Sequence, residues 1–395
     1  MDPSRQMHVD INSCFASIEQ LSNPLLQGKP VAVAAYKSEW GVILAASREA
    51  KKLGIGTGTR VGEAKKICPE IVILEPDTPK YRFIHRQLKK ILVRYSPRVV
   101  AKSIDEFAIN FKRVEGNLIS TAKEIKKEIA VEIGPWLTVS IGIGPNRFLA
   151  KTASNMQKPD GLVEINSNNF ENIYKKLDLI KLNGINWRTA LRLQLSGIEN
   201  TWDFYSATRQ KLKSIFCSVL GEYWYWRLRG VEIDGKKEEA EKSYSNIYSL
   251  KKRAKNRAEL LSVIYQLALK SGNKLRRKKR MATGVALWLL LSNGNWNKVG
   301  RAKTGMVNGW EIYREAIKLL PTEIKGEVKR VTVYIFDLKP AVWIQDDLFG
   351  KRGKFIKLTK TVDLINDKFG AGTIIPGTLM EKIKIPDFIG FGQTR

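Results

Sequence analysis

Val9-Asp10-Ile11-Asn12, near the start of the chain, and Ser103-Ile104-Asp105-Glu106, further along, are the stretches that decide the fold. Each is typical of a hydrophobic strand that ends in carboxylate side chains. Carboxylates brought together on adjacent strands repel one another unless cations lie between them. Such oxygen ligands suit Mg²⁺, and two ions can hold both reacting oxygens of a phosphoryl transfer. The alternative for either stretch alone is a solvated turn or hairpin tip.

The composition indicates a globular protein of several domains with a polyanionic partner. A chain of 395 residues with 43% hydrophobic side chains can bury roughly two to four cores. The formal charge of +29 favours nucleic acid as the partner, although a membrane surface or a ribosomal partner also fits the charge alone. Residues 236–340 hold 24 Lys and Arg against 9 Asp and Glu. We therefore expect a basic surface that lies away from the acidic stretches.

The residue counts argue against several classes of protein. Cys14, Cys68 and Cys217 are too few and too scattered for a disulfide framework or a zinc site. Because His8 and His85 are the only histidines, we expect neither a histidine-ligated metal nor a Ser-His triad. We expect no signal peptide, because the chain runs directly into a strand after a few polar residues, and no apolar run is long enough to cross a membrane. We therefore expect a soluble, intracellular protein. We also expect it to be a monomer of the cytoplasm that associates with the nucleoid.

The hydrophobic periodicity of the first half predicts a split βαβ sheet with helices on one face. This order of elements would place Asp10 beside Asp105 on neighbouring central strands. Residues 24–75 form a compact insert of short strands and helices. The expected strands are 8–13, two that bracket the acidic pair up to residue 111, and 137–143. The expected helices are 15–19, 79–95 with Thr78 as its cap, 122–133 and 147–157.

The second half predicts a helical region and then a basic α+β domain. Leu182-Asn183-Gly184-Ile185-Asn186 is typical of a helix-hairpin-helix, whose glycine turn lets backbone N–H groups approach a DNA phosphate. An ordinary turn between two helices is the alternative. After a polar linker, the expected elements are a helix at 257–280, strands at 282–292 and 328–337, and a helix at 310–319.

These motifs, together with a third one, resemble those of the Y-family, or translesion, DNA polymerases, most of all the bacterial polymerase IV branch. Residues 8–19 are similar to the first motif of the family, and residues 103–106 to the second. The third is matched by residues 140–146, then Leu149-Ala150-Lys151 and Lys158-Pro159-Asp160-Gly161. The motifs occur in the family's order, and the resemblance covers nearly the whole chain.

The resemblance implies an α+β multidomain fold of the right-hand polymerase type. It also implies low-fidelity, template-directed DNA synthesis across lesions, with primer-template DNA and deoxynucleoside triphosphates as partners. The implied domains are a ferredoxin-like palm at 1–23 and 76–165, small fingers at 24–75, a helical thumb with the helix-hairpin-helix at 166–232, a linker at 233–243, an α+β little finger at 244–340, and a C-terminal extension at 341–395.

The resemblance also assigns roles to the acidic side chains. Asp10, Asp105 and Glu106 would be the catalytic residues. Together with the Ile11 carbonyl they would hold two Mg²⁺ ions, the cofactor of the reaction.

Five positions would contact the incoming nucleotide. Phe15 would exclude a 2′-hydroxyl, and Lys158 would contact the triphosphate. Arg48 stands where the family commonly has tyrosine. Lys51 replaces an arginine and so lacks the bidentate fork. Cys14 replaces an aromatic residue.

The remaining implied contacts are with DNA and with a sliding clamp of the bacterial β type. Residues 345–349 resemble the peptide by which bacterial polymerases bind the clamp, with an exposed loop as the alternative. The expected clamp anchors are Gln345, Leu348 and Phe349, and the expected DNA contacts are Gly184, Ile185, Asn186, Lys274, Arg276, Arg277 and Arg330.

Two other functions compete with an active polymerase. A catalytically inert adaptor of the same fold would bind DNA and clamp, but inert relatives lose the acidic ligands that this chain keeps. A cyclase on a related palm would leave the basic domain and the charge of +29 without a purpose.

Overall fold

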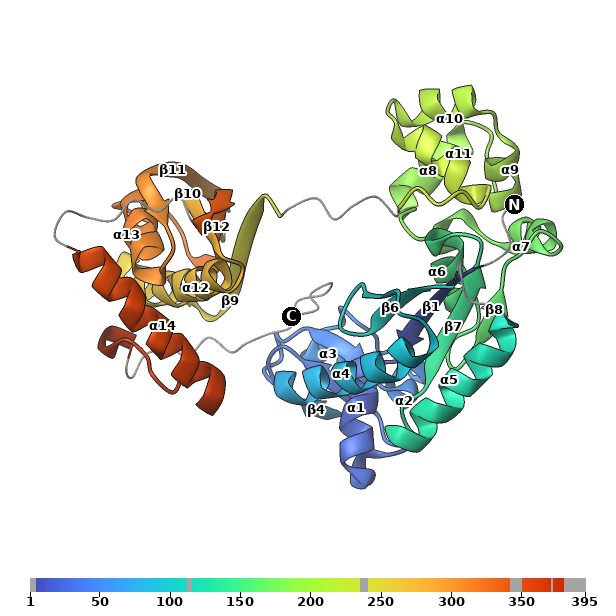
Figure 1. Cartoon of the computed structure of the whole chain (residues 1–395), viewed down its shortest axis with the longest axis horizontal. Helices are drawn as coiled ribbons and strands as arrows, with labels where there is room; N and C mark the ends of the chain where they lie inside the picture. The colour runs from blue at the N-terminus through green and yellow to red at the C-terminus, as the bar shows by residue number, and fades with distance from the viewer. Residues whose placement is uncertain (1–4, 112–115, 235–240, 342–349, 371, 380–395) are drawn as a thin grey trace. The chain divides into compact units, whose positions relative to one another are not determined.

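The computed structural model describes residues 5–111, 116–234, 241–341, 350–370 and 372–379. These residues form two compact units, which we call the N-terminal unit (5–234) and the C-terminal unit (241–379) (Figure 1). Within the described residues, no helix combines the length and the apolar character needed to cross a membrane.

A five-stranded sheet forms the centre of the N-terminal unit, with the strand order β5-β6-β1-β7-β8. Strand β1 (Gln6–Ile11) lies between β6 (Glu106–Asn110) and β7 (Val139–Gly144) and is antiparallel to both. The outer strands are β5 (Val99–Ala101) and β8 (Leu162–Glu164), and β8 runs parallel to β7. All six residues of β1 are buried, so its polar side chains must find partners inside the protein.

Four amphipathic helices pack around this sheet, each through apolar side chains at helical spacing. Leu88 and Ile91 of one helix and Ile125 and Ile129 of another enter the same core as Phe107 of β6. The expected order of strands and helices is confirmed, and only β8 was not expected. The helices are α1 (Cys14–Ser22), α4 (Thr78–Tyr95), α5 (Leu118–Glu132) and α6 (Arg147–Met156).

The insert between α1 and α4 has its own three-stranded sheet and its own small core. Helix α2 (Arg48–Lys52) begins directly after a strand, where the Ser47 hydroxyl accepts a hydrogen bond from the amide of Ala50. This cap fixes where the helix starts and therefore where Arg48 and Lys51 project. The other elements are η1 (Pro24–Leu26), β2 (Val31–Ala34), β3 (Ile43–Ala46), α3 (Val61–Ile67) and β4 (Val72–Leu74).

A helical region closes the N-terminal unit around a core rich in aromatic side chains. Tyr174, Phe204 and Trp224 are buried in this core, and Phe148 of α6 meets the Trp224 ring edge-on at 5.3 Å. The helices are α7 (Phe170–Lys176), η2 (Leu179–Lys181), α8 (Trp187–Leu195), α9 (Thr201–Ser206), α10 (Arg209–Phe216) and α11 (Leu220–Leu228).

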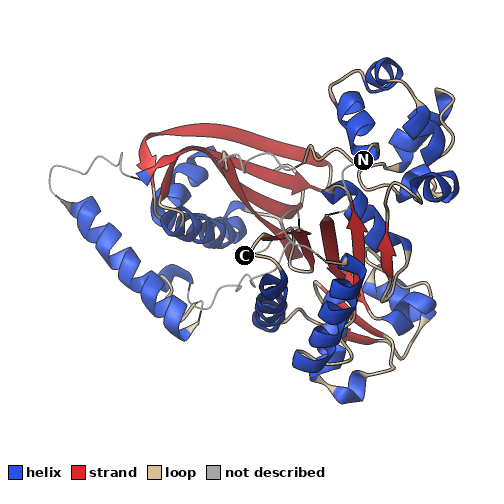
Figure 2. Cartoon of the chain, turned by 45° about the vertical axis from the view of Figure 1, so that its right-hand side comes forward, coloured by secondary structure: helices blue, strands red, loops and turns tan. Residues whose placement is uncertain are grey.

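The C-terminal unit is an antiparallel sheet of order β11-β10-β12-β9, with α12 and α13 packed on one face (Figure 2). The sequence predicted α12 (Arg257–Arg277), α13 (Gly309–Leu319), β10 (Arg280–Leu291) and β12 (Val328–Pro340). Three elements were not expected: the edge strands β9 (Ser243–Ala254) and β11 (Gly294–Met306), and helix α14 (Lys351–Phe369), which precedes the short η4 (Gly377–Leu379).

Candidate active site

The acidic centre lies where β1 and β6 meet. Asp10 and Glu106 are direct cross-strand partners, and the amide of Ile11 donates to the Asp105 carbonyl at 2.9 Å. One oxygen of Asp10, one oxygen of Glu106 and one ring nitrogen of His8 all lie within 4.8 Å of one another. The register of the sheet therefore brings together two carboxylates that are far apart in the sequence.

Asp105, which we expected on the strand beside Asp10, instead lies in the bend just before β6, and Glu106 takes the position opposite Asp10. Asp105 Oδ1 accepts a hydrogen bond from the Ser103 hydroxyl, and the side chain is half-buried. Burial raises the pKa of the Cys14 thiol, and the charges of Asp105 and Asp10 add to that rise. Both carboxylates are thus close enough to act on Cys14, which is buried at the start of α1.

Two lysines supply positive charge to the acidic centre. The Lys158 ammonium is 2.8 Å from Asp10 Oδ1, and the Lys151 ammonium of α6 is 2.9 and 2.7 Å from the two Glu106 oxygens. Burial raises the pKa of Asp10 to about 6, although Lys158 opposes that shift. Burial also acts to raise the pKa of Glu106, but the hydrogen bond from Lys151 and other positive charges leave it below its ordinary value.

The donor set of the acidic centre fits a divalent cation that prefers oxygen. Closely spaced carboxylate oxygens of different strands are the ligands that Mg²⁺ takes in proteins. The lysines contact these oxygens through long, flexible side chains. These side chains are partly exposed, 36% for Lys151 and 37% for Lys158. Such side chains can swing aside without a change in the sheet.

Lys158 and Lys51 lie next to Asp10, and Arg48 lies next to Lys51. Lys51 Nζ is 2.8 Å from the Ser13 hydroxyl, and Arg48 donates a hydrogen bond to the Thr138 hydroxyl. Burial lowers the pKa of Lys51, and the nearby positive charges of Lys158 and Arg48 act in the same direction. The structure therefore brings together the three cations that the sequence assigned to the nucleotide.

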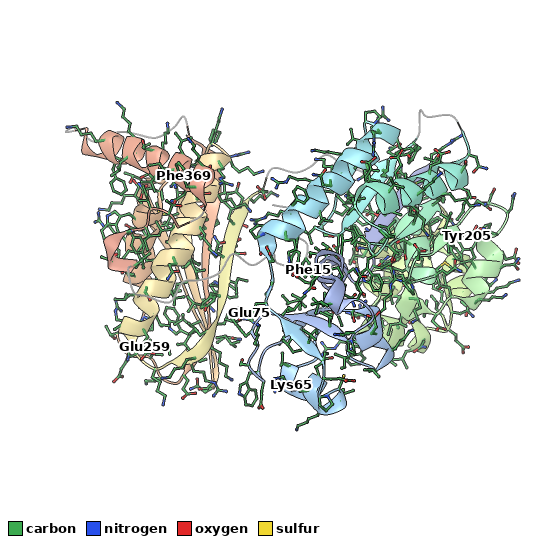
Figure 3. All side chains as sticks on the ribbon, turned by 90° about the horizontal axis from the view of Figure 1, so that it is seen from below. Phe15, Lys65, Glu75, Tyr205, Glu259 and Phe369 are labelled. Atoms are coloured by element: carbon green, nitrogen blue, oxygen red, sulfur yellow. The ribbon has the colours of Figure 1, made fainter. Side chains whose placement is uncertain are left out.

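The Phe15 ring lies in the first turn of α1 (Figure 3). It stacks on the ring of Tyr81, with centroids 4.5 Å apart and planes 13° from parallel. The Tyr81 hydroxyl donates to Glu19 at 2.8 Å, and the Lys80 ammonium lies 2.7 Å from the same carboxylate. A ring braced in this way cannot easily turn aside for a larger ligand.

Asn12 has a connecting role that local sequence does not reveal. Its side-chain amide donates to the Ser140 hydroxyl at 2.8 Å, and its oxygen accepts from the Thr138 hydroxyl at 3.1 Å and from the Asp160 amide at 2.9 Å. Asn12 thus joins β1, β7 and the turn that follows Lys158. All three partners lie more than a hundred residues away in the sequence, so only the fold brings them together.

Comparison with known proteins identifies the family. Residues 9–155 match the impB/mucB/samB family, and residues 241–348 match its C-terminal domain. DNA polymerase IV 1 of Bacillus subtilis (strain 168) is 30% identical over 389 residues, which cover 95% of this chain and 93% of that protein. A Y-family DNA polymerase chimera of Dbh and Dpo4 superimposes with a TM-score of 0.74 at 24% identity, over 84% of this chain and 98% of that chain. The chain belongs to the Y family of DNA polymerases.

Other relatives agree with this Y-family assignment. DNA polymerase IV of Treponema denticola is 27% identical over 388 residues, which cover 95% of this chain and 97% of that protein. The insertion ternary complex of Dbh DNA polymerase has the same fold, with a TM-score of 0.57. The mixed α+β architecture expected from the sequence is therefore confirmed.

The hairpin segment has the conformation of a glycine turn followed by a capped helix. Gly184 has a φ of +91°, and a side chain there would meet the Trp224 ring at 3.5 Å. The Asn186 side chain caps α8 by accepting from the amide of Thr189, while Ile185 is buried. Gly184 itself is exposed, so the backbone of the turn faces solvent.

The basic residues predicted to bind DNA in the C-terminal unit fall into two groups. Arg276 is only 12% exposed and makes two hydrogen bonds to Asp363 of α14, at 2.6 and 2.8 Å. Arg277 pairs with Asp367, and the Lys274 ammonium lies 4.1 Å from the centre of the Tyr244 ring. Each of these three side chains thus has a partner within the unit, but only Arg276 is largely buried.

Arg330 differs from that group because it lies on the exposed face of the sheet. Its direct neighbours in the sheet are Leu290 on β10 and Ser249 on β9. Two residues from these neighbours along the same strands, and on the same face, lie the exposed Trp288 and Ile247. Alternation along β12 buries Val331 on the opposite face. The predicted clamp anchors Gln345, Leu348 and Phe349 lie outside the described residues.

Proposed function

We propose that this Y-family protein extends a DNA primer along damaged templates by a two-metal nucleotidyl transfer. The primer 3′-oxygen bonds to the α-phosphorus of a deoxynucleoside triphosphate, the bond to the β-phosphate oxygen breaks, and pyrophosphate leaves. The observation that carries this proposal is the cross-strand pair Asp10 and Glu106 beside the cations Arg48, Lys51 and Lys158. The protein is a template-directed DNA polymerase that carries out translesion synthesis.

Asp10, Asp105, Glu106 and the Ile11 carbonyl would hold the two Mg²⁺ ions. When bound, such ions lower the pKa of the attacking hydroxyl and neutralise the leaving group. Lys158, Lys51 and Arg48 would bind the triphosphate oxygens, since Lys158 and Lys51 lie beside Asp10 and Arg48 lies beside Lys51. Phe15 would press against C2′ of the sugar and exclude ribonucleotides.

The domain roles follow the same proposal. The five-stranded sheet would be the palm (1–23 and 76–165), and the insert would be the fingers (24–75). The helical region (166–232) would be the thumb, whose Gly184 turn contacts DNA phosphate through its backbone. After the linker (233–243), the second sheet (244–340) would be the little finger, which grips duplex DNA through Arg330 and its neighbours.

We also propose that the C-terminal extension (341–395) binds a β-type sliding clamp through Gln345, Leu348 and Phe349. An extended peptide that offers a glutamine and two adjacent apolar side chains suits a pocketed docking groove. Replacing Leu348 and Phe349 with alanine should weaken clamp binding but leave extension in the absence of the clamp unchanged. Unaltered clamp affinity would discard this motif.

The alternative of a catalytically inert adaptor is not favoured. An inert protein would not need two carboxylates on neighbouring strands, each paired with a lysine. Substitutions that removed these carboxylates would not weaken its binding to DNA. A cyclase is not favoured either, because the matched relatives are DNA polymerases.

The decisive experiment is primer extension with Mg²⁺ on undamaged and abasic templates. We expect wild type to add nucleotides and Asp105→Ala to add none, while both bind the duplex equally. Glu70→Gln is the matched control, because Glu70 is an exposed carboxylate of the same unit outside the acidic centre. Equal extension by wild type and Asp105→Ala, or none by wild type, would overturn the proposal.

A further inference from the structure

We propose that helix α14 is a docking surface for an acidic amphipathic helix of a partner protein. This surface goes beyond the proposed reaction, because α14 belongs to the C-terminal unit and the acidic centre to the N-terminal unit. It consists of five apolar side chains, which we call the α14 stripe. Their positions alternate in steps of three and four residues: Phe355, Leu358, Val362, Ile365 and Phe369.

The first argument is that α14 turns its polar side toward its own unit. Near the start of the helix, Arg352 Nε donates to a glutamate of α13 at 2.9 Å. Three turns later, Asp363 accepts two hydrogen bonds from Arg276 of α12, at 2.6 and 2.8 Å, and Asp367 pairs with the arginine that follows. An amphipathic helix normally packs its apolar side against the rest of its domain. Because ion pairs hold α14 instead, its apolar side is left for another molecule.

The second argument is the exposure of the α14 stripe. Phe355 is 40% exposed, Leu358 59% and Phe369, at the end of the helix, 66% (Figure 3). Val362 and Ile365 between them are half-buried. From Phe355 to Phe369 the stripe is about 21 Å long, given the rise of an α-helix. A continuous exposed row of large apolar side chains marks an interaction site rather than ordinary surface.

The third argument is that the spacing of the stripe suits a second helix. Steps of three and four residues are the a and d positions of a heptad repeat, and a stripe this narrow is typical of the seam between two helices. A helix that lies in a membrane surface has instead a strongly apolar face opposite a strongly polar one. In α14 the side away from the stripe carries the exposed Leu364 among its lysines.

The fourth argument is that the exposed charges of α14 are positive. Both acids of the helix, Asp363 and Asp367, are paired with arginines of α12. Two of its lysines directly precede a residue of the stripe, at the g positions, where charge selects the partner of a coiled coil. A second copy of the chain would bring the same lysines, whereas an acidic helix complements them. The exposed lysines are Lys354, Lys357, Lys360 and Lys368.

The test measures binding of a fluorescent peptide to the full chain by anisotropy. The probe is a four-turn peptide with leucine at a and d and glutamate at e and g, whose glutamates keep it from pairing with itself. A peptide of the same composition with shuffled leucines controls for attraction to a chain of charge +29. We expect the heptad peptide to bind at least about tenfold more tightly than the shuffled peptide.

Leu358→Asn and Leu364→Asn are matched variants for the apolar contact. Both leucines are exposed, but their spacing of six residues places them on different sides of the helix. Leu358→Asn should weaken binding of the heptad peptide by at least about tenfold, because that leucine would be buried on binding. Leu364→Asn should leave the affinity unchanged. Both variants should extend primers as wild type does, since each replaces an exposed side chain.

Lys354→Glu and Lys360→Glu are matched variants for the charge. Lys354 flanks the stripe, whereas Lys360 lies on the other side of the helix. We expect Lys354→Glu to weaken binding of the heptad peptide by about twofold to fivefold, which is the range of an exposed ion pair. Lys360→Glu should weaken it less. An equal loss in the two variants would show that the peptide responds to net charge and not to the flank of the stripe, which would contradict the proposal.

Several outcomes would overturn the proposal. These are no binding of the heptad peptide to wild type, equal binding of the two peptides, and an equal loss in Leu358→Asn and Leu364→Asn. Binding to phosphatidylglycerol vesicles that Leu358→Asn abolishes would assign the stripe to a membrane. Self-association that Leu358→Asn abolishes would assign it to a second copy. Primer extension by wild type without the peptide tests the proposed function separately and does not depend on any of these results.

Discussion

The acidic centre of the N-terminal unit and the basic end of α12 in the C-terminal unit are both dense in charge, yet the structure uses them differently. At the acidic centre, Asp10 and Glu106 face each other and meet flexible lysines that can swing aside. At the end of α12, Arg276 is tied to Asp363 of α14 by two hydrogen bonds and is largely buried. The partner of a charged side chain, more than its place in the sequence, decides whether the side chain is available to a ligand.

The largest expected effect is a difference in the rate of primer extension between substitutions in the two regions. Glu106→Gln removes the charge that would hold a metal, and we expect primer extension to fall by at least about a hundredfold, as when a preorganised electrostatic group is lost. Arg276→Gln should leave extension nearly unchanged, because Arg276 is engaged with α14. Rates of single-nucleotide insertion measure both. An equal loss in the two variants would place the end of α12 in the catalytic machinery.

The second effect concerns the choice of sugar. Phe15→Ala opens the space beside the nucleotide sugar, and we expect discrimination against ribonucleotides to fall by about tenfold to a hundredfold. Tyr81→Phe keeps the ring stacked on Phe15 but loses the hydrogen bond to Glu19, so its effect should be smaller. Insertion of matched ribonucleotides and deoxynucleotides measures the ratio. Unchanged selectivity in Phe15→Ala would refute the steric role.

The third effect tests how α14 is held. Asp363→Ala leaves the mostly buried Arg276 guanidinium without its carboxylate, which should cost about 1–3 kcal/mol of local stability. Asp367→Ala breaks an exposed pair with Arg277 and should cost about 1 kcal/mol or less. Hydrogen exchange of the α14 amides reports both costs. Faster exchange in Asp367→Ala than in Asp363→Ala would contradict this ranking.

The smallest expected effect compares Arg330 with Arg276 in the C-terminal unit, through the salt dependence of DNA binding. Arg330→Gln removes one exposed cation from the open face of the sheet, and the slope of log affinity for duplex DNA against log salt should fall by about 1. Arg276→Gln should leave that slope unchanged. Binding titrations at several salt concentrations measure both slopes. The reverse result would show that the pair with Asp363 opens when DNA binds.

Much of the fold could be predicted from local patterns. The alternation at Val9 and Ile11 predicted β1, and the helical spacing of Leu88 and Ile91 with the proline at 79 predicted α4 (Thr78–Tyr95). Strands β9 and β11 were missed because they are edge strands. β11 in particular carries mostly polar, exposed side chains, so no apolar alternation marks it. Helix α14 was missed because its contact with α12 depends on ion pairs rather than on an apolar stripe.

Candidate site residues could be predicted only where a short local sequence motif marks them. Asp10, Asp105 and Glu106 stand at strand ends within recognisable motifs. Asn12 gave no such signal, since its partners come from distant strands and turns. The pairing of Arg276 with Asp363 depends on a contact between residues 87 positions apart, which a run of basic residues cannot reveal.

The lysines at the acidic centre have a consequence for how the protein is made and stored. Because Lys151 and Lys158 neutralise Glu106 and Asp10 within the chain itself, the central sheet can fold without a divalent cation between these carboxylates. Binding of the proposed cation would then be an exchange of one counter-ion for another. Each lysine released by that exchange is set free next to the position at which a polyphosphate is expected to arrive.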